Sequence, residues 1–319
     1  MDKPLVSICC LTYNHGRFIS RCLDGFLMQK TSFAFEALIH DDASTDNNAD
    51  IIRAYEAKYP DIIKPVYQTE NRYSRGLAIS EFFIYPRVQG KYMALCEGDD
   101  YWTDPNKLQR QVDFLEANPQ YCACAHQCMS IYDYRDSDPK PFNTKIKDSF
   151  DLNDLLDGCV FQTATIMFRT SLIGELEKMP NEVFSGDRGL FFLCTVHSPV
   201  KFFPEPMSVY RINRTGVSTT VTYKHLIGDL RMIPWLIGIF PHFPRYHYTS
   251  YIYKTVISYP PRVPFPVYMK YYFLYAWYSF SFFPKNIRPL LKFTFLTTPK
   301  FAVSRLFPNL KWKRLQAWR

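Results

Sequence analysis

The sequence is poor in glycine, and its glycines do not form phosphate-binding motifs. The 319 residues include 12 glycines. No Gly-x-Gly-x-x-Gly follows the first predicted strand, and no Gly-x-x-x-x-Gly-Lys-Ser/Thr occurs anywhere. Because those motifs cradle phosphates with backbone N–H groups at a helix start, their absence excludes the usual dinucleotide and P-loop sites. If the protein binds a phosphate compound, a metal ion is the better predicted holder.

The chain also lacks an N-terminal targeting pattern and a long apolar run. Met1-Asp2-Lys3-Pro4 leads directly into a strand-like segment, without the basic start, apolar stretch and cleavage site of a secretory signal. This predicts a cytosolic N-terminus. The most apolar C-terminal segment, residues 271–283, has 13 residues, whereas a membrane-spanning helix needs about 20. We therefore expect no transmembrane helix.

Cysteine patterns do not indicate a disulfide framework or a zinc site. The nine cysteines are an odd number and lie mostly in apolar runs, which is typical of reduced core thiols. Cys122, Cys124, His126 and Cys128 have a spacing that could suggest zinc. In a strand, however, alternate residues stand about 6–7 Å apart per step, so four of them cannot converge on one ion. Packing in the core is the favoured interpretation.

Acidic residues are missing from the last 90 residues. All 30 Asp and Glu lie within residues 1–229 together with 24 Lys and Arg, which gives this part a net charge of −6. Residues 230–319 contain 14 Lys and Arg and 25 of the chain's 55 aromatic residues. The change in composition predicts a domain boundary near residue 225, followed by a basic-aromatic helical region over residues 226–319.

The first part of the chain alternates strand and helix patterns. Apolar runs typical of buried parallel strands occur at residues 5–11, 37–40, 62–67 and 92–96. Helical patterns follow the first three runs, over residues 18–27, 44–55 and 76–87, and a further helix begins at Asp104-Pro105. This order predicts an α/β fold with a mostly parallel sheet flanked by helices.

The densest cluster of charge follows the fourth predicted strand. Residues 97–102 read Glu-Gly-Asp-Asp-Tyr-Trp, so three carboxylates occupy four positions. At the carboxyl end of a buried strand, such a cluster can hold Mg²⁺ or Mn²⁺ and leave one face for phosphate oxygens. An acidic surface turn before a helix cap is the alternative. The metal site is favoured because polar residues also follow other strands, and ligands of parallel sheets bind beyond the strands' carboxyl ends.

Three motifs stand in order along this part of the chain. They are Val6-Ser7-Ile8 leading into Thr12-Tyr13-Asn14, then Asp41-Asp42-Ala43-Ser44-Thr45-Asp46, then Glu97-Gly98-Asp99-Asp100-Tyr101-Trp102 with Asp104-Pro105. Together they resemble an inverting family 2 glycosyltransferase with the GT-A fold. The resemblance is good over residues 4–130, looser over 150–220, and fades beyond about 225. It implies a Rossmann-like catalytic domain over residues 1–225, with a nucleotide-binding part at 4–130 and an acceptor part at 131–225.

The resemblance implies a donor-binding site at the first two motifs. In that family the loop after the first strand and the second motif hold the nucleotide base, usually uracil, and the ribose. Carried over, Thr12, Tyr13 and Asn14 form one wall, and Asp42 accepts a hydrogen bond from the base. A carboxylate suits an imide N–H, and an aromatic ring stacks on a base. A plain turn-forming role before Ser44 is the alternative for Asp42.

The third motif matches the family's Asp-x-Asp region, whose last carboxylate ligates a metal that bridges the diphosphate. This implies Asp100 as the ligand of Mn²⁺ or Mg²⁺ and Asp99 as a contact to a ribose or sugar hydroxyl. Asp99 and Glu97 are the alternative metal ligands. Glu97 stands where many members have Asp, and its longer side chain changes the reach of the carboxylate.

An inverting transfer also needs a carboxylate that takes the proton of the acceptor hydroxyl. The family's base lies in a Gly-Asp or Glu-Asp segment before a helix, which implies Asp187. An ordinary helix cap is the alternative. Further on, Asn213 stands where the family commonly has His, so Arg211 or Arg214 would supply charge to the diphosphate instead. Solvated arginines beside a strand would give the same pattern.

The resemblance therefore implies an enzyme, a metal-dependent inverting hexosyltransferase. Its donor would be a nucleoside diphosphate sugar, expected to be UDP-linked. Its acceptor would be a hydroxyl of a lipid-linked or polysaccharide molecule, as in capsule, O-antigen or other cell-surface glycan synthesis. The alternative is a catalytically silent protein at the membrane that binds sugar nucleotides or acts as a scaffold, which the departure at Asn213 supports. A nucleotidyl transferase would need a loop richer in glycine and basic residues after the first strand.

The basic-aromatic region suits an anionic membrane surface. Each basic residue near such a surface adds about 1 kcal/mol of binding, and aromatic rings settle at the interface. Nucleic acid is the rival partner, and aromatic helices packed on the catalytic domain are the plain alternative. Because apolar side chains are dense among the rings, we expect no nucleic acid partner. We expect a cytoplasmic protein, peripheral at the inner face of the plasma membrane.

Overall fold

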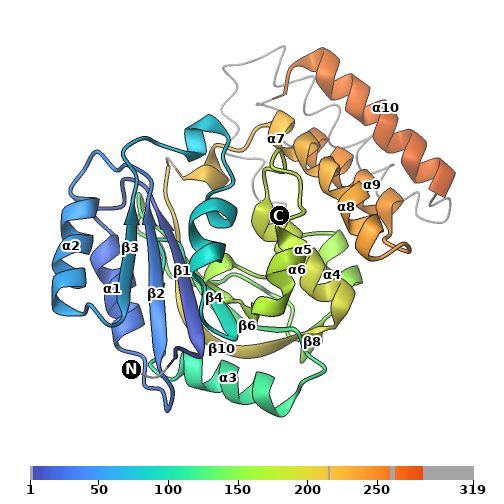
Figure 1. Ribbon diagram of the computed structural model, residues 1–319. Helices are drawn as coiled ribbons and strands as arrows, with labels where there is room; N and C mark the ends of the chain where they lie inside the picture. The colour runs from blue at the N-terminus through green and yellow to red at the C-terminus, as the bar shows by residue number, and fades with distance from the viewer. Residues whose placement is uncertain (1–2, 215, 259–262, 283–319) are drawn as a thin grey trace. The chain divides into compact units, whose positions relative to one another are not determined.

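The computed structural model describes residues 3–214, 216–258 and 263–282 (Figure 1). The strands are β1 Val6–Thr12, β2 Phe35–Asp41, β3 Ile63–Tyr67, β4 Tyr92–Leu95, β5 Tyr101–Trp102, β6 Ala123–Tyr132, β7 Lys140–Pro141, β8 Ser149–Phe150, β9 Met167–Arg169 and β10 Val200–Ile212. The α-helices are α1 Ile19–Leu27, α2 Asn48–Lys58, α3 Lys107–Ala117, α4 Leu152–Leu156, α5 Ile173–Leu176, α6 Gly186–His197, α7 Tyr223–Gly228, α8 Met232–Ile239, α9 Arg245–Ser258 and α10 Phe265–Phe282.

The N-terminal strands form the parallel part of the sheet. Their order is β3-β2-β1-β4, and each neighbouring pair is parallel. Val6 and Ile8 on one face of β1 and Ser7 and Cys9 on the other are all buried, as expected for a strand covered on both faces. Figure 1 shows α1 and α2 along one side of these strands. The predicted α/β alternation is confirmed, and the carboxyl ends of β1, β2 and β4 share one edge of the sheet.

The third predicted helix is not a continuous α-helix. Its residues include a π-helical turn, Ser80–Ile84, followed by a 3₁₀ turn, Tyr85–Arg87. Pro86 explains the break, because it has no N–H to donate to the carbonyl of Phe82 and so interrupts the α-helical ladder. The prediction over residues 76–87 was therefore wrong in helix type and continuity.

The rest of the sheet is mixed and is built around the long strand β10. This strand pairs in parallel with β6 and antiparallel with β5 and β8, while β9 joins β4 to β6 by antiparallel pairing. The register of β10 against β6 shifts around Pro206, since proline interrupts a ladder and is tolerated at bulges. Beyond this irregularity, the last residues of β10 run beside the segment that follows β4.

Helix α1 packs against β5 and thereby supports the segment between β4 and β5. The rings of Phe26 and Trp102 lie 4.9 Å apart in an edge-to-face contact, and Trp102 Nε1 donates to the Ala164 carbonyl at 3.0 Å. A Cβ on Gly25 would stand 3.0 Å from the Trp102 backbone nitrogen, so glycine permits this close approach. Trp102 is therefore a rigid anchor directly after the carboxylate cluster.

The chain divides into two compact units. The first comprises residues 1–220 and 231–243, and the second comprises residues 221–230 and 244–319. The described part of the second unit contains α7, α9 and α10, which pack around Val256, Ile257, Tyr268 and Tyr275. Within residues 3–258 and 263–282, apart from residue 215, no helix combines the length and apolarity that crossing a membrane requires. The predicted helical region extends to residue 319, and residues 283–319 lie outside the described part.

A lysine is buried in the core at the start of α3. Lys107 is fully buried, its Nζ donates to Gln111 Oε1 at 2.8 Å, and it lies 3.9 Å from the centroid of the Trp102 ring. Burial lowers the pKa of Lys107 to about 7, and the nearby Cys96 thiol opposes this shift only in part. In the folded protein at neutral pH, the neutral and charged forms of Lys107 are therefore about equally populated.

Replacing this lysine is expected to change how stability depends on pH. Between pH 7 and 10.5, the unfolded chain holds a proton on Lys107 that the folded chain lacks, so the free energy of unfolding of the native protein rises with pH. Lys107 contributes about 1.4 kcal/mol per pH unit to this increase in the free energy of unfolding. The variant Lys107→Met is expected to lack this contribution. Urea unfolding from pH 7 to 10 measures the difference between the two proteins.

The exposed Lys30 supplies the matched control, Lys30→Met, for loss of one lysine charge. If the difference in unfolding free energy between Lys107→Met and the native protein stays constant over this range, Lys107 is not buried in its neutral form.

Candidate active site

The carboxylate cluster forms a tight turn that is fastened to the end of β1. The Gly98 N–H donates to the Leu11 carbonyl at 2.9 Å, and the Asp100 N–H donates to the Glu97 carbonyl at 3.0 Å. A Cβ on Gly98 would stand 2.6 Å from Thr12 Oγ1, so only glycine allows the two segments to lie this close. We call residues 97–100 the acidic turn.

Asp100 connects the acidic turn to β10. Its side chain is 2% exposed, and Oδ1 accepts the backbone N–H of Arg211 at 2.8 Å. Burial raises the pKa of Asp100 well above its usual value, and the Asp99 charge adds to the rise, while the Arg211 N–H opposes it. The predicted metal ligand is thus a buried carboxylate that already holds the backbone of β10.

Asp99 points to a more open place, where three segments meet. Its side chain is 17% exposed. Asn213 Nδ2, just after β10, donates to Asp99 Oδ2 at 2.9 Å, and His15 Nε2, just after β1, lies 3.9 Å from the same oxygen. Burial lowers the pKa of His15, and the Asp99 charge opposes this shift. The Asn213 amide therefore positions Oδ2 of Asp99, and the His15 imidazole lies beside the same oxygen.

The arginines near the acidic turn have partners within the protein. Arg211 is 8% exposed, donates to the Asp99 carbonyl at 2.6 Å, and lies 4.5 Å from the centroid of the Tyr101 ring. Arg21 covers the same ring at 3.9 Å. Arg214 lies 4.9 Å from the Tyr134 ring centroid. The Arg211 guanidinium thus supports the backbone of the acidic turn, and contacts of Arg211 and Arg214 with a diphosphate stay predictions.

The loops after β1 and β2 are interlocked. Asn14 adopts a left-handed conformation with φ of 55°, its N–H donates to Ser44 Oγ at 2.9 Å, and its Oδ1 accepts the Thr45 N–H at 2.7 Å. Thr12 Oγ1 donates to Asn48 Oδ1 at 3.1 Å. Tyr13 is 42% exposed. Of the predicted donor wall, the Tyr13 ring is accessible, whereas Thr12 and Asn14 use side-chain oxygens to hold the loops.

Asp42 anchors the segment that follows β3. Its side chain is 4% exposed. Oδ1 accepts the Arg72 N–H at 2.7 Å, and Oδ2 accepts the Tyr73 N–H at 2.9 Å. These contacts differ from the alternative of a local turn before Ser44, because the backbone that Asp42 holds lies thirty residues further along the chain. The contact of Asp42 with a base stays a prediction.

Asp187 lies in the first turn of α6 and is exposed. Its Oδ1 accepts the N–H of Arg188 at 2.8 Å. Its charge also acts on Glu97, whose pKa is raised to about 8 by burial first and then by the charges of Asp99 and Asp187. The Asp187 charge therefore lies within electrostatic range of Glu97, about ninety positions earlier in the chain.

The acidic turn fits a divalent metal that is completed by a bound nucleotide. Within residues 3–258 and 263–282, leaving out residue 215, no group of three or more His, Cys, Asp or Glu is placed to enclose an ion. Mg²⁺ in nucleotide sites commonly takes one or two carboxylates, several waters and the phosphates of the substrate. Asp99, whose side chain is 17% exposed, suits this arrangement better than the buried Asp100, and His15 beside it was not assigned from the sequence. The signal was its position, four residues after the apolar run of residues 5–11.

Comparisons with known proteins bear on the family and the fold of the chain. The family model described as glycosyl transferase family 2 matches residues 7–176. An uncharacterized protein of Mycobacterium tuberculosis is 35% identical over 214 residues, which are 66% of this chain and 60% of that protein. The putative teichuronic acid biosynthesis glycosyltransferase TuaG of Bacillus subtilis is 31% identical over 179 residues, 56% of this chain and 67% of TuaG. The chain thus spans about 60% of the length of the mycobacterial relative.

Two solved structures share the fold. S. aureus TarS in complex with UDP-GlcNAc has a TM-score of 0.63 at 15% identity, covering 86% of this chain and 81% of TarS. The mannosyltransferase PcManGT from Pyrobaculum calidifontis, in complex with GDP-Man and Mn²⁺, has a TM-score of 0.51 at 17% identity, covering 97% of this chain and 89% of PcManGT. At these identities the likeness shows a GT-A fold, which confirms the predicted fold class.

The contacts of Asp42 can be tested by hydrogen exchange. In Asp42→Ala the N–H groups of Arg72 and Tyr73 lose their acceptor, so both amides are expected to exchange faster. The free energy of unfolding should fall by about 1–3 kcal/mol, because buried donors are left unpaired. Asp42→Asn keeps one acceptor oxygen and should protect one of the two amides. Unchanged exchange at both positions in Asp42→Ala would show that Asp42 does not hold this segment.

Proposed function

The chain belongs to glycosyl transferase family 2, and on this premise we propose that it transfers a sugar from a UDP-linked donor to a hydroxyl with inversion. The observation that carries the proposal is the acidic turn after β4, fastened to the end of β1, with the Asp187 charge acting on its Glu97. An open carboxylate near the diphosphate and a second one for the acceptor proton are the two groups that this chemistry needs.

The proposed donor is a nucleoside diphosphate sugar bound over the loops after β1 and β2. Two solved structures with this fold contain such compounds, UDP-GlcNAc in TarS and GDP-Man in PcManGT. In this chain, the accessible ring of Tyr13 is the candidate stacking surface for the base. We retain UDP as the expected nucleotide.

The proposed metal ligand is Asp99 rather than Asp100. Asp100 is 2% exposed and holds the Arg211 N–H, whereas Asp99 is more open and lies beside His15. Mn²⁺ or Mg²⁺ held there would neutralise charge that develops on the departing diphosphate. Glu97 is less suitable, since burial raises its pKa to about 8 and so favours its neutral form.

Asp187 is the proposed general base. In an inverting transfer, the acceptor oxygen bonds to the anomeric carbon while the bond from that carbon to the diphosphate breaks and takes its electron pair to the nucleotide. Asp187 would take the hydroxyl proton. Its exposure suits a role that requires contact with an incoming acceptor, and its position at the start of a helix fixes its direction.

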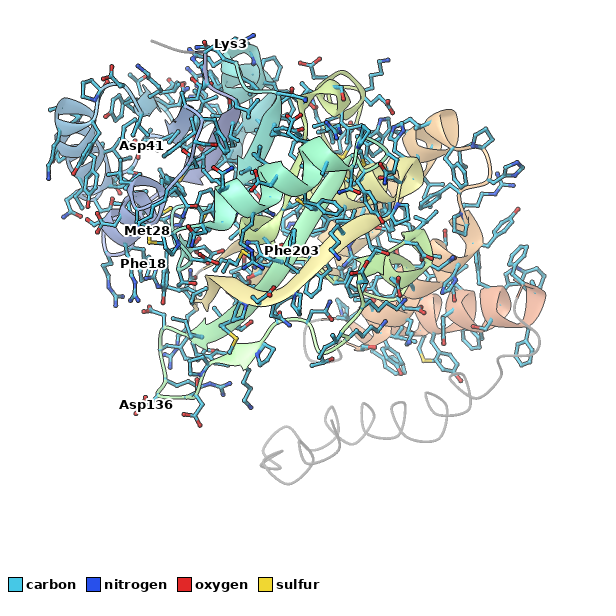
Figure 2. The ribbon with its side chains drawn as sticks, turned by 90° about the horizontal axis from the view of Figure 1, so that it is seen from below. Lys3, Phe18, Met28, Asp41, Asp136 and Phe203 are labelled. Atoms are coloured by element: carbon cyan, nitrogen blue, oxygen red, sulfur yellow. The ribbon has the colours of Figure 1, made fainter. Side chains whose placement is uncertain are left out.

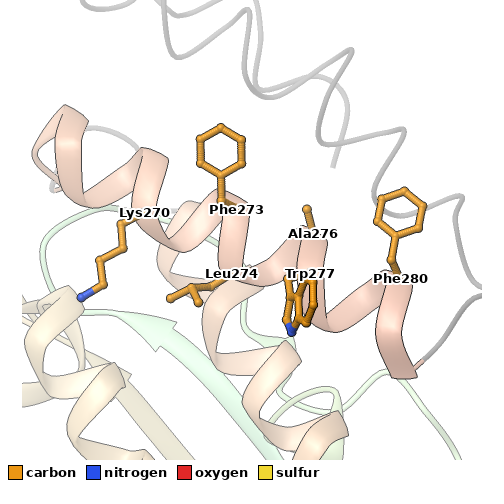
Figure 3. Close-up of a pocket in the computed structure, with 6 residues that line it drawn as sticks. All are labelled: Lys270, Phe273, Leu274, Ala276, Trp277 and Phe280. Atoms are coloured by element: carbon orange, nitrogen blue, oxygen red, sulfur yellow. The ribbon is translucent and has the colours of Figure 1, made fainter.

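The proposed acceptor is a lipid-linked or polysaccharide glycan at the inner face of the plasma membrane. The name of the relative TuaG refers to teichuronic acid biosynthesis. In this chain, α10 carries exposed rings at Phe273, Trp277 and Phe280, with Lys270 and Leu274 on the same helix (Figure 3). Aromatic rings next to a basic side chain suit the headgroup layer of an anionic membrane. Contact of this helix with the membrane would bring the enzyme to its acceptor.

Substitution of the two carboxylates separates donor binding from turnover. With Mn²⁺ and a panel of nucleotide sugars, Asp99→Asn is expected to lose metal-dependent donor binding. Asp187→Asn should bind donor normally but react about 10²–10⁴-fold more slowly, which is the usual contribution of a general base. Calorimetry measures binding, and release of nucleotide measures turnover.

Asp136→Asn is the matched control, because Asp136 is exposed at the tip of the loop between β6 and β7 (Figure 2). Donor binding without turnover by the native protein, even with glycan acceptors supplied, would favour the scaffold alternative. Full activity in Asp187→Asn would remove this residue from the mechanism.

Membrane contact by α10 is tested by flotation with phosphatidylglycerol vesicles. Replacing Phe273, Trp277 and Phe280 together by serine should reduce the bound fraction of the full chain several-fold, since burial of each ring is worth roughly 1.5–3 kcal/mol. Ile146 and Val217 are exposed in the first unit, and their double replacement by serine is the control. Equal flotation of the two variants would contradict a role of α10.

A further inference from the structure

Two cysteines that are far apart in the sequence lie together where β6 begins and α6 ends. Cys122 immediately precedes β6, and Cys194 lies in the last turn of α6. Cys122 Sγ donates to the Cys194 carbonyl at 3.2 Å. The Cys122 N–H donates to Ser198 Oγ at 3.0 Å, and Ser198 Oγ donates to Cys122 Sγ at 3.2 Å. Hydrogen bonds therefore hold the Cys122 side chain against the C-terminal end of α6.

The two thiols differ in their access to solvent. Of the nine cysteines, Cys159 is exposed, Cys122 is partly exposed, and the other seven, with Cys194 among them, are buried. A reagent in solution can therefore reach Cys122, whereas Cys194 is 0% exposed. An accessible thiol next to a second cysteine is an arrangement typical of cysteines that respond to oxidants.

The surroundings of Cys122 favour its thiolate. The neighbouring Cys194 side chain has the largest effect, and together with the Ser198 hydroxyl it lowers the pKa of Cys122 to about 7, although burial opposes this shift. Burial, and then the Cys122 sulfur, raise the pKa of Cys194 well above its usual value. In β6 itself, burial raises the pKa of Cys124 to about 12. Because the thiolate is the reactive form of cysteine, Cys122 is the nucleophile of the pair and Cys194 remains a thiol.

We propose that Cys122 and Cys194 form a reversible disulfide when the protein meets hydrogen peroxide. In the first step, the Cys122 sulfur attacks one peroxide oxygen, the O–O bond breaks, and the other oxygen leaves as hydroxide, which takes up a proton to give water. Cys122 is then a sulfenic acid. In the second step, the Cys194 sulfur attacks the Cys122 sulfur, and the sulfenic hydroxyl leaves with the Cys194 proton as water. In total, two thiols are oxidised to one disulfide, and the peroxide is reduced to two molecules of water.

The disulfide would join the start of β6 to the last turn of α6. Asp187 lies in the first turn of the same helix, so the bond would tether the helix that carries the proposed general base. A dithiol reductant reverses the reaction by attacking the disulfide through its own thiolate. This inference goes beyond the proposed function, because it requires neither a sugar donor nor a metal.

Mass spectrometry after peroxide treatment tests the proposal. The reduced full chain is incubated with hydrogen peroxide at neutral pH, and the intact mass and the proteolytic peptides are measured. The native protein is expected to lose the mass of two hydrogen atoms, with the Cys122 and Cys194 peptides linked, and dithiothreitol should restore the original mass. Cys194→Ala should instead accumulate sulfenic acid on Cys122, which dimedone captures. Cys122→Ser should form no disulfide at Cys194.

Cys159→Ser is the matched control, because Cys159 is more exposed than Cys122, and this variant should form the disulfide as the native protein does. Oxidation of Cys159 while Cys122 stays reduced would show that exposure alone decides reactivity, and it would overturn the proposal. A native protein in which Cys122 is oxidised without a link to Cys194, or is not oxidised at all, would overturn it as well. These measurements on the native protein stand even if a variant does not fold.

Discussion

The bond between the buried Asp100 carboxylate and the Arg211 N–H is the contact on which the candidate site depends. It is 2.8 Å long and joins segments 111 residues apart. The Arg211 guanidinium returns to the Asp99 carbonyl at 2.6 Å, so the acidic turn is held by both the backbone and the side chain of one residue. A buried carboxylate is costly unless it is hydrogen-bonded. Here it holds the backbone next to Asp99, whose side chain is partly exposed.

Other polar side chains at this edge of the sheet also divide into buried ones that bind backbone groups and more accessible ones. Asp42 is buried and holds the N–H groups of Arg72 and Tyr73, and Asn14 ties the loop after β1 to the loop after β2. These polar groups hold backbone segments in place through hydrogen bonds. Asp99 and Asp187 remain accessible for ligands. Pre-organisation of this kind reduces the loss of entropy when a flexible substrate binds.

Much of the fold could be predicted from the sequence, because its evidence is local. Apolar runs and helical periodicity indicated β1 to β4 with helices α1 and α2, and the family motifs located the acidic turn. The role of each carboxylate could not be predicted, because it depends on which of two adjacent residues meets β10, far along the chain. The position of His15 beside Asp99 could not be predicted for the same reason, since the two residues are 84 positions apart. Residues 231–243, which belong to the first unit, also lie beyond the composition change near 225.

Anomalous diffraction from crystals of the protein with Mn²⁺ and UDP tests the central claim most directly. The account predicts a manganese peak within about 2.2 Å of an Asp99 carboxylate oxygen, with Asp100 still bonded to the Arg211 N–H. A peak coordinated by Asp100, with that hydrogen bond broken, would contradict the account. It would mean that metal binding breaks the hydrogen bond between Asp100 and Arg211, and that this bond does not position Asp99 as the metal ligand.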